Sequence, residues 1–239
     1  MTSKRFWTTF SVMARKARRS VGGLIYHVLN RANSRRRLFL TDKDYLAFFR
    51  VLLEARDRWP AVQVLALCAM PNHWHLVVRP SGDGELSNFM RWLTQTHTQR
   101  WRHAKRTVGY GALYQGRFKS FVVQEDRHLL VLCRYVERNP LRAKLVKRAE
   151  EWRWSSAWIR ASADTGLCAL LTDDWPVDRP GNWQTLLNEP QSEKDEERVR
   201  LSVQRNRPLG DTGWVEKTSA KLKLEHTLRP AGRPRKEKE

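Results

Sequence analysis

Residues 61–79 read AVQVLALCAMPNHWHLVVR, and this stretch decides the fold because it contains two strand patterns joined by a turn. Residues 61–70 are rich in Val, Leu and Ala, which is typical of a buried strand. Pro71 and Asn72 favour a turn, and residues 73–79 resume an apolar and aromatic run. The stretch therefore predicts a β-hairpin.

The segments on either side of the hairpin alternate between strand and helix patterns. In chain order, the other predicted elements are a strand at 24–30, a helix at 41–58, a helix at 85–106, a strand at 113–123 and a helix at 125–139. Without the last helix, this is the order of the ferredoxin-like fold, an α+β class with a split βαβ antiparallel sheet and helices on one face. In that topology the strand at 73–79 lies in the middle of the sheet.

The chain is strongly basic. It contains 45 Lys and Arg against 25 Asp and Glu in 239 residues, which gives a formal net charge of +20. Residues 1–40 hold ten of the basic residues and no acidic one. Arginine dominates, and its guanidinium group binds phosphates in a bidentate manner. This charge distribution favours a nucleic acid as the partner.

The composition also excludes several classes of protein. Hydrophobic residues make up 41% of the chain, which is enough for a core. No apolar run approaches the roughly 18 residues of a membrane span, and no apolar segment of a secretory signal follows the basic N-terminus. Three cysteines without CxxC spacing argue against a disulfide framework and fit a reducing cytosol. We therefore expect a cytoplasmic protein with no membrane partner.

The predicted organisation is one main domain with an extension at each end. Residues 1–21 are polar and cationic without a sustained period, so we expect a flexible basic arm. Residues 22–160 carry the predicted sheet and its helices. Residues 161–239 form a C-terminal extension with a helical and irregular structure. Within it, 172–208 look loop-like because Asp, Pro, Asn and Glu are frequent, and 209–228 predict a short helical unit before a basic tail.

Two histidines lie two positions apart on the second strand of the hairpin. Because side chains alternate along a strand, His73 and His75 point to one face, about 7 Å apart, and Trp74 points into the core on the other. Two imidazoles in this arrangement can bind one divalent ion. The alternative is one core histidine and one surface histidine.

A tyrosine and an asparagine lie on the last predicted helix, four residues apart. Tyr135 and Asn139 therefore share one helix face. The alternative is a half-buried tyrosine and a helix-ending asparagine before Pro140. Joined with the histidine pair, however, they form a coherent reaction centre. His73, His75 and the amide oxygen of Asn139 would hold Mg²⁺ or Mn²⁺, and Tyr135 would attack phosphorus as a nucleophile.

Three motifs, MPNHWHLVV, YQGRFKS and YVERNPLRAKLV, closely resemble those of the IS200-like tyrosine transposases. This family belongs to the HUH endonucleases, and the similarity is best with the branch associated with repetitive extragenic palindromes (REP). The resemblance covers about residues 20–160, with His73, His75 and Tyr135 on the motif positions and Asn139 on the position typical of the REP-associated branch. It implies a bacterial, nucleoid-associated enzyme that cuts and rejoins single-stranded DNA at hairpin ends. The expected products are a 5′-phosphotyrosine and a free 3′-OH, and the enzyme is expected to act as a monomer or homodimer.

Further basic residues are candidates for DNA contacts. Arg117 and Lys119 alternate with Phe118, so they share one strand face and could hold backbone phosphates. Residues 35–37 form an arginine run, Arg35, Arg36 and Arg37, that could guide a hairpin stem. The alternative for both sets is that they are solvated surface charges. Tyr114 is the main competitor of Tyr135 as nucleophile.

Two other functions remain open from the sequence. RNA-recognition domains share the ferredoxin-like order, so the chain could be a catalytically inactive DNA- or RNA-binding protein. It could also be a replication initiator with HUH chemistry, although 239 residues leave little space for the helicase regions that such proteins usually carry.

Overall fold

The computed structural model describes residues 20–163 and 165–229. The predicted basic arm and the basic tail therefore lie almost entirely outside the described residues. The described residues form four strands: β1 (Ile25–Arg31), β2 (Val62–Met70), β3 (His73–Pro80) and β4 (Lys119–Val123). The longer helices are α1 (Asp42–Arg58), α2 (Glu85–Ala104), α3 (Arg127–Glu137), α8 (Glu193–Arg205) and α9 (Thr212–Leu222). The shorter ones are η1 (Asn33–Arg35), α4 (Asn139–Arg142), η2 (Ala149–Glu151), α5 (Ser156–Ser162), α6 (Thr165–Cys168), α7 (Trp183–Asn188) and η3 (Glu225–Thr227).

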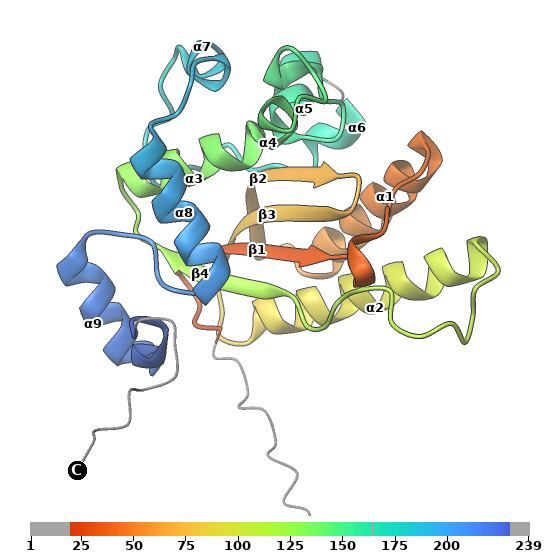
Figure 1. Cartoon of the computed structure of the whole chain (residues 1–239), viewed down its shortest axis with the longest axis horizontal. Coiled ribbons are helices and arrows are strands. Elements are labelled where there is room, and N and C mark those ends of the chain that lie inside the picture. The colour runs from red at the N-terminus through yellow and green to blue at the C-terminus, as the bar shows by residue number, and fades with distance from the viewer. Residues whose placement is uncertain (1–19, 164, 230–239) are drawn as a thin grey trace, which may run out of the picture.

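The four strands form one antiparallel sheet in the order β2-β3-β1-β4. β1 and β3 occupy the two central positions, and α1 and α2 pack together on one face of the sheet (Figure 1). The ferredoxin-like α+β fold predicted from the sequence is therefore confirmed. The opposite face is covered by α3, the helix that follows the ferredoxin-like unit, and by parts of the C-terminal extension.

The β2–β3 hairpin directs its side chains to two different cores. On β3, Trp74 is fully buried in the core formed with α1 and α2, where its indole N–H donates to the Tyr114 hydroxyl at 3.1 Å. His75 and Val77 point to the other face, toward α3. The predicted alternation is thus confirmed, and Trp74 anchors the strand while the histidine pair faces away from it.

The C-terminal extension is more helical than the sequence predicts. The prediction of a loop over 172–208 is wrong, because the whole of α7 and of α8 forms there. α8 begins after Ser192, whose hydroxyl accepts a hydrogen bond from the Asp195 backbone N–H, and its acidic first turn suits the helix dipole. On α8, Val199 and Ser202 are the buried positions, so its apolar face is too narrow to show a helical period. Packing against α3 and β4 stabilises it instead.

The last strand is shorter than predicted. The strand expected at 113–123 pairs with β1 from Lys119 onward, and before it Tyr114 makes an isolated bridge with Ala32. Gly116, with φ at 159°, lies between these two pairings. Arg117 therefore precedes the strand, and the prediction that Arg117 and Lys119 share one strand face is wrong. Both side chains are exposed.

A buried carboxylate ties the C-terminal extension to α3. Glu137 is fully buried and accepts hydrogen bonds from the Ser156 hydroxyl, from the Arg160 guanidinium at 2.8 Å and from the Trp183 indole at 2.7 Å. Arg160 also donates to the Leu65 carbonyl of β2 at 2.6 Å. Three donors satisfy this buried charge, as its burial requires. The cluster fixes the end of α3 that carries Tyr135.

Within residues 20–163 and 165–229, no helix is both long enough and apolar enough to cross a membrane.

Candidate active site

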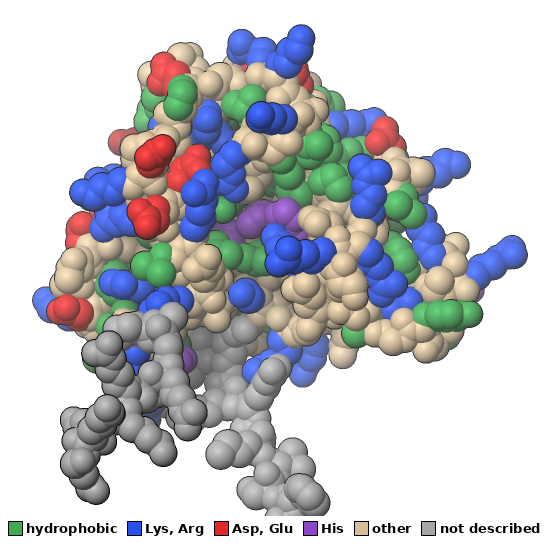
Figure 2. Space-filling model, in the orientation of Figure 1, with side chains coloured by type: hydrophobic (Ala, Val, Ile, Leu, Met, Phe, Trp, Pro, Cys, Tyr) green, Lys and Arg blue, Asp and Glu red, His purple; other side chains and the backbone are tan. Residues whose placement is uncertain are grey.

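A cavity of about 260 Å³ opens on the sheet face that α3 covers. Its lining includes His73 and His75 from β3, Tyr135 from α3 and Asn139 from α4. Figure 2 shows histidine side chains in a hollow near the middle of the molecule, with Lys and Arg side chains around it. Acidic side chains lie mainly toward α7 and α8 (Figures 1 and 2). The fold therefore gathers, within one chain, the four side chains that the sequence suggested as a reaction centre.

The two imidazoles of the cavity are each held at one ring nitrogen. His73 Nδ1 lies 2.6 Å from the Asn72 amide oxygen, and His75 Nδ1 lies 2.8 Å from Nε2 of His27. The centroids of the His73 and His75 rings are 4.9 Å apart. Nε2 of His75 is buried and has no hydrogen-bond partner among the described residues. In metal-binding histidines, one ring nitrogen is hydrogen-bonded to a supporting group and the other is free to bind the ion.

The electrostatic surroundings keep these histidines neutral. Burial, and then the nearby charges of Arg31 and Arg142, lower the pKa of His73 to about 3. Burial, followed by the neighbouring His73, holds the pKa of His75 well below its usual value. At pH 7 both rings are therefore unprotonated on one nitrogen and can offer a lone pair.

Tyr135 and Asn139 complete the cavity from the helical side. The Tyr135 and His75 ring centroids are 6.4 Å apart. The Asn139 side-chain N–H group donates to the Tyr135 carbonyl at 3.1 Å, and its oxygen accepts from Arg142 at 2.7 Å. An amide oxygen has a second lone pair, so this contact leaves one free. Two imidazole nitrogens and an amide oxygen form a donor set that can hold one divalent cation with open positions.

Two arginines of the cavity were not identified from the sequence. The Arg142 guanidinium carbon lies 4.1 Å from the centroid of the Tyr135 ring, and its Nη1 lies 3.7 Å from the Glu196 carboxylate of α8. Arg31 ends β1, where it pairs with His73. Arg142 lies within the YVERNPLRAKLV motif, and its place in that motif was the feature of the sequence that could have identified it. Nothing in the charge pattern shows which of many arginines face the cavity.

A third histidine supports the pair from the neighbouring strand. His27 is fully buried on β1, where Leu29 rather than His27 is the register partner of His75. Burial, and then the neighbouring His73, lower its pKa to about 3. No sequence pattern marks His27 for a role, because its contact with His75 depends on the pairing of β1 with β3.

The arginine run 35–37 and Lys119 lie beside elements that line the cavity. The Arg35 carbonyl accepts from the Asn72 side chain at 3.3 Å, which places the arginine run 35–37 beside the turn that precedes His73. Arg36 donates to the Ala112 carbonyl at 3.1 Å, and all three arginines of the run are exposed. Lys119 is the register partner of Leu29, which lines the cavity.

The competing nucleophile is on the wrong face. Tyr114 is buried in the core with α1 and α2, where its hydroxyl contacts the Trp74 indole and Nδ1 of His97 at 2.7 Å. Burial raises its pKa far above the usual value for a phenol. Tyr114 is therefore remote from the histidine pair and unsuited to ionise.

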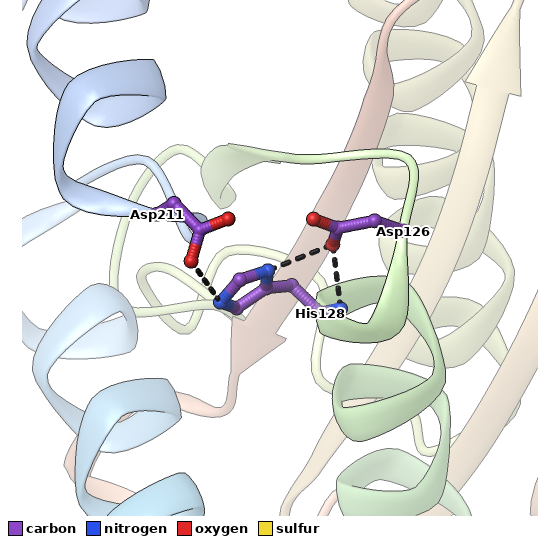
Figure 3. A group of neighbouring side chains, drawn as sticks. All are labelled: Asp126, His128 and Asp211. Atoms are coloured by element: carbon purple, nitrogen blue, oxygen red, sulfur yellow. Dashed lines mark hydrogen bonds and ion pairs between the residues drawn. The ribbon is translucent and has the colours of Figure 1, made fainter.

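A second group with metal-binding side chains lies at the other end of α3. Ligand atoms of Asp126, His128 and Asp211 lie within 4.8 Å of one another, close enough to hold one ion (Figure 3). Asp126 accepts from the backbone N–H of His128 at 2.7 Å and lies 2.7 Å from its Nδ1, while Nε2 is 3.8 Å from Asp211.

Several features make this second group a better fit for a structural link than for a metal centre. Asp126 and Asp211 are the N-cap residues of α3 and α9, and helix N-termini disfavour cations. The Arg127 guanidinium also lies 3.8 Å from the same Asp211 oxygen. The group connects the C-terminal extension to the start of α3.

The sequence and the fold of the chain resemble those of known proteins. The sequence model of the family described as "Transposase IS200 like" matches residues 20–139, and the chain belongs to this family. A Haemophilus influenzae protein assigned as a REP-associated tyrosine transposase is 22% identical over 162 residues, which cover 64% of this chain and 88% of that protein. A solved structure of a REP-associated tyrosine transposase bound to a REP hairpin superposes with a TM-score of 0.52 at 21% identity, and covers 68% of this chain and 91% of that one. This likeness supports the same fold.

Proposed function

We propose that this protein is a metal-dependent transposase that cleaves and rejoins single-stranded DNA at palindromic, REP-like hairpins. The observation that carries the proposal is the cavity in which His73, His75, Asn139 and Tyr135 meet. Membership of the IS200-like family supports the transposase activity. The hairpin substrate is supported by the structural neighbour, which is bound to a REP hairpin.

In this proposal each side chain of the cavity has one role. His73, His75 and Asn139 would hold Mg²⁺ or Mn²⁺, and the ion would supply charge neutralisation at the scissile phosphate. The Tyr135 hydroxyl oxygen bonds to phosphorus while the bond from phosphorus to the 3′ oxygen breaks; the phenol gives up its proton and the leaving 3′ oxygen takes one up, so the step balances. The products are a 5′-phosphotyrosine and a free 3′-OH, so the energy of the broken bond is conserved for rejoining.

The cations around the cavity position the DNA. Arg31 and Arg142 lie beside the histidines and the tyrosine, where they can hold the non-bridging oxygens of the phosphate. Outside the cavity, Arg35, Arg36, Arg37, Arg117 and Lys119 offer exposed charges to the flanking backbone.

The site also bears on where and how the protein acts. All of the proposed catalytic side chains belong to one chain, so each protomer of a monomer or homodimer carries a full set. A DNA substrate and buried, unpaired cysteines Cys68 and Cys133 both fit action in the bacterial cytoplasm, in association with the nucleoid.

The proposal is tested by incubating the full chain with a single-stranded palindromic oligonucleotide and Mn²⁺. We expect a covalent protein–DNA adduct that survives denaturing electrophoresis, together with a released strand ending in 3′-OH. Hairpin binding that is insensitive to a chelator, without any adduct, would instead support the inactive DNA-binding protein. An adduct formed equally well on unstructured strands would contradict the hairpin preference.

Removing the arginine run should weaken the salt dependence of hairpin binding. Each phosphate contact contributes about 0.7 to 0.9 to the slope of log affinity against log salt, because counterions are released. We expect the triple variant Arg35→Gln, Arg36→Gln, Arg37→Gln to flatten the slope by about 2 to 3. Fluorescence anisotropy over a salt series measures it.

The matched control for this variant neutralises three exposed lysines at α9. The control changes are Lys217→Gln, Lys221→Gln and Lys223→Gln, which remove the same formal charge from another part of the surface. An equal loss of slope in both triple variants would show that net charge, rather than the arginine run, governs binding.

A further inference from the structure

His27 is buried, and its one polar contact among the described residues is with the candidate metal ligand His75. It is fully buried on β1, and its Nε2 lies 2.8 Å from Nδ1 of His75 on β3. The two rings are tilted by 34° with centroids 5.0 Å apart, and Phe121 of β4 packs beside His27 at 4.8 Å. Nδ1 of His27 has no hydrogen-bond partner among the described residues.

The direction of the hydrogen bond between His27 and His75 depends on which of the two ring nitrogens carries the proton. If His75 carries its proton on Nδ1, it donates to His27, and its Nε2 presents a lone pair to the cavity. If His27 carries the proton on Nε2, it donates to His75, whose own proton then sits on Nε2. In the second arrangement His75 cannot bind a cation in the cavity, because its Nε2 carries a proton and has no free lone pair.

We propose that His27 is a positioning residue that sets the tautomer of His75 and so makes the cavity competent for a divalent cation. The inference rests on the proposed role of His75 as a ligand. His73 obtains the equivalent support from the Asn72 amide oxygen at 2.6 Å, which can only accept a hydrogen bond. The two imidazoles therefore differ in their support. His73 is bonded to an amide oxygen that can only accept, whereas His75 is bonded to a histidine that can donate or accept.

Because His27 can either donate to His75 or accept from it, the tautomer of His75 depends on whether a cation occupies the cavity. In one tautomer the buried His27 Nδ1–H lacks an acceptor among the described residues, and in the other the His75 Nε2–H does. Each form of the free protein therefore leaves one buried donor unpaired. A cation at His75 Nε2 is compatible with the first form alone, so its binding selects that form.

The test measures Mn²⁺ affinity in the full chain by isothermal titration calorimetry. We expect His27→Phe, which removes the acceptor, to weaken Mn²⁺ binding by about 10- to 100-fold. His27→Gln should recover most of the affinity, because its amide oxygen can accept from His75. The matched control is His97→Phe, since His97 is also buried and bonded but lies on the opposite face; its Mn²⁺ affinity should equal that of the wild type.

A second measurement needs no variant. Long-range nitrogen–proton NMR of the imidazoles, with saturating Mg²⁺, should show His75 of the wild type protonated on Nδ1 and His27 also on Nδ1. His75 protonated on Nε2 under these conditions, or wild-type Mn²⁺ affinity in His27→Phe, would overturn the role of His27. Failure of the proposed function looks different: the wild type would bind no Mn²⁺, or bind it equally well after His73→Ala.

Discussion

Replacing Tyr135 with phenylalanine is expected to abolish the covalent protein–DNA adduct and to reduce strand cleavage by at least roughly 10³-fold. The substitution removes one oxygen atom from a ring that is 6% exposed and keeps its packing under Arg142. Folding and hairpin binding should therefore be preserved while the nucleophile is lost. Denaturing electrophoresis of a labelled oligonucleotide with Mn²⁺ measures the adduct and the cleaved strand together.

The control for this variant is Tyr114→Phe. Tyr114 lies in the core on the opposite face, bonded to Trp74 and His97, so its loss should lower stability but leave adduct formation intact. An adduct that persists at the wild-type rate in Tyr135→Phe would show that another residue is the nucleophile.

Replacing His73 with alanine is expected to remove Mn²⁺ binding at the cavity and to stop cleavage. A ligand contributes more than its supporting groups, whose loss already weakens metal affinity by about 10- to 100-fold, so we expect a loss greater than about 100-fold. Hairpin affinity should change little, because most candidate phosphate contacts lie outside the cavity. Calorimetry with Mn²⁺ and anisotropy with the hairpin separate the two effects.

A surface histidine provides the comparison for His73→Ala. His103 is exposed on α2, away from the cavity lining, and His103→Ala should retain both Mn²⁺ binding and cleavage. If His73→Ala still cleaves at the wild-type rate and remains sensitive to chelators, the metal must be held elsewhere, and the Asp126, His128 and Asp211 group would be the next to test.

The fold could be predicted largely because its information is local. The β2–β3 hairpin follows from a turn between two apolar runs, and α1 follows from Thr41 and Asp44, which form a capping box at its start. α8 could not be predicted in the same way. Its composition is polar and its buried face is narrow, so its stability comes from contacts with α3 and β4 that no local pattern records.

The candidate site could be predicted in part for the same reason. The spacing of His73 and His75 within one strand sets their common face. Tyr135 and Asn139 were predicted to share one helix over 125–139, but α3 ends at Glu137 and Asn139 begins α4, so the turn at Arg138 and the hydrogen bond from Asn139 to the Tyr135 carbonyl bring them together. The buried supports around them could not be predicted. His27 reaches His75 across 48 positions of sequence, and Glu137 meets Trp183 across 46.

The sequence by itself determined the order of the strands and helices of the ferredoxin-like unit, the common face of His73 and His75 on their strand, and the strongly basic character of the chain. The tertiary structure alone decided that α3 lies across the face to which the histidine pair points, and that β1 supplies His27 and Arg31 beside it. The physical reason is the distance along the chain over which each interaction acts. Backbone periodicity and capping act over a few residues, whereas the cavity depends on strand register and helix packing, which are set by the burial of side chains far apart in the chain.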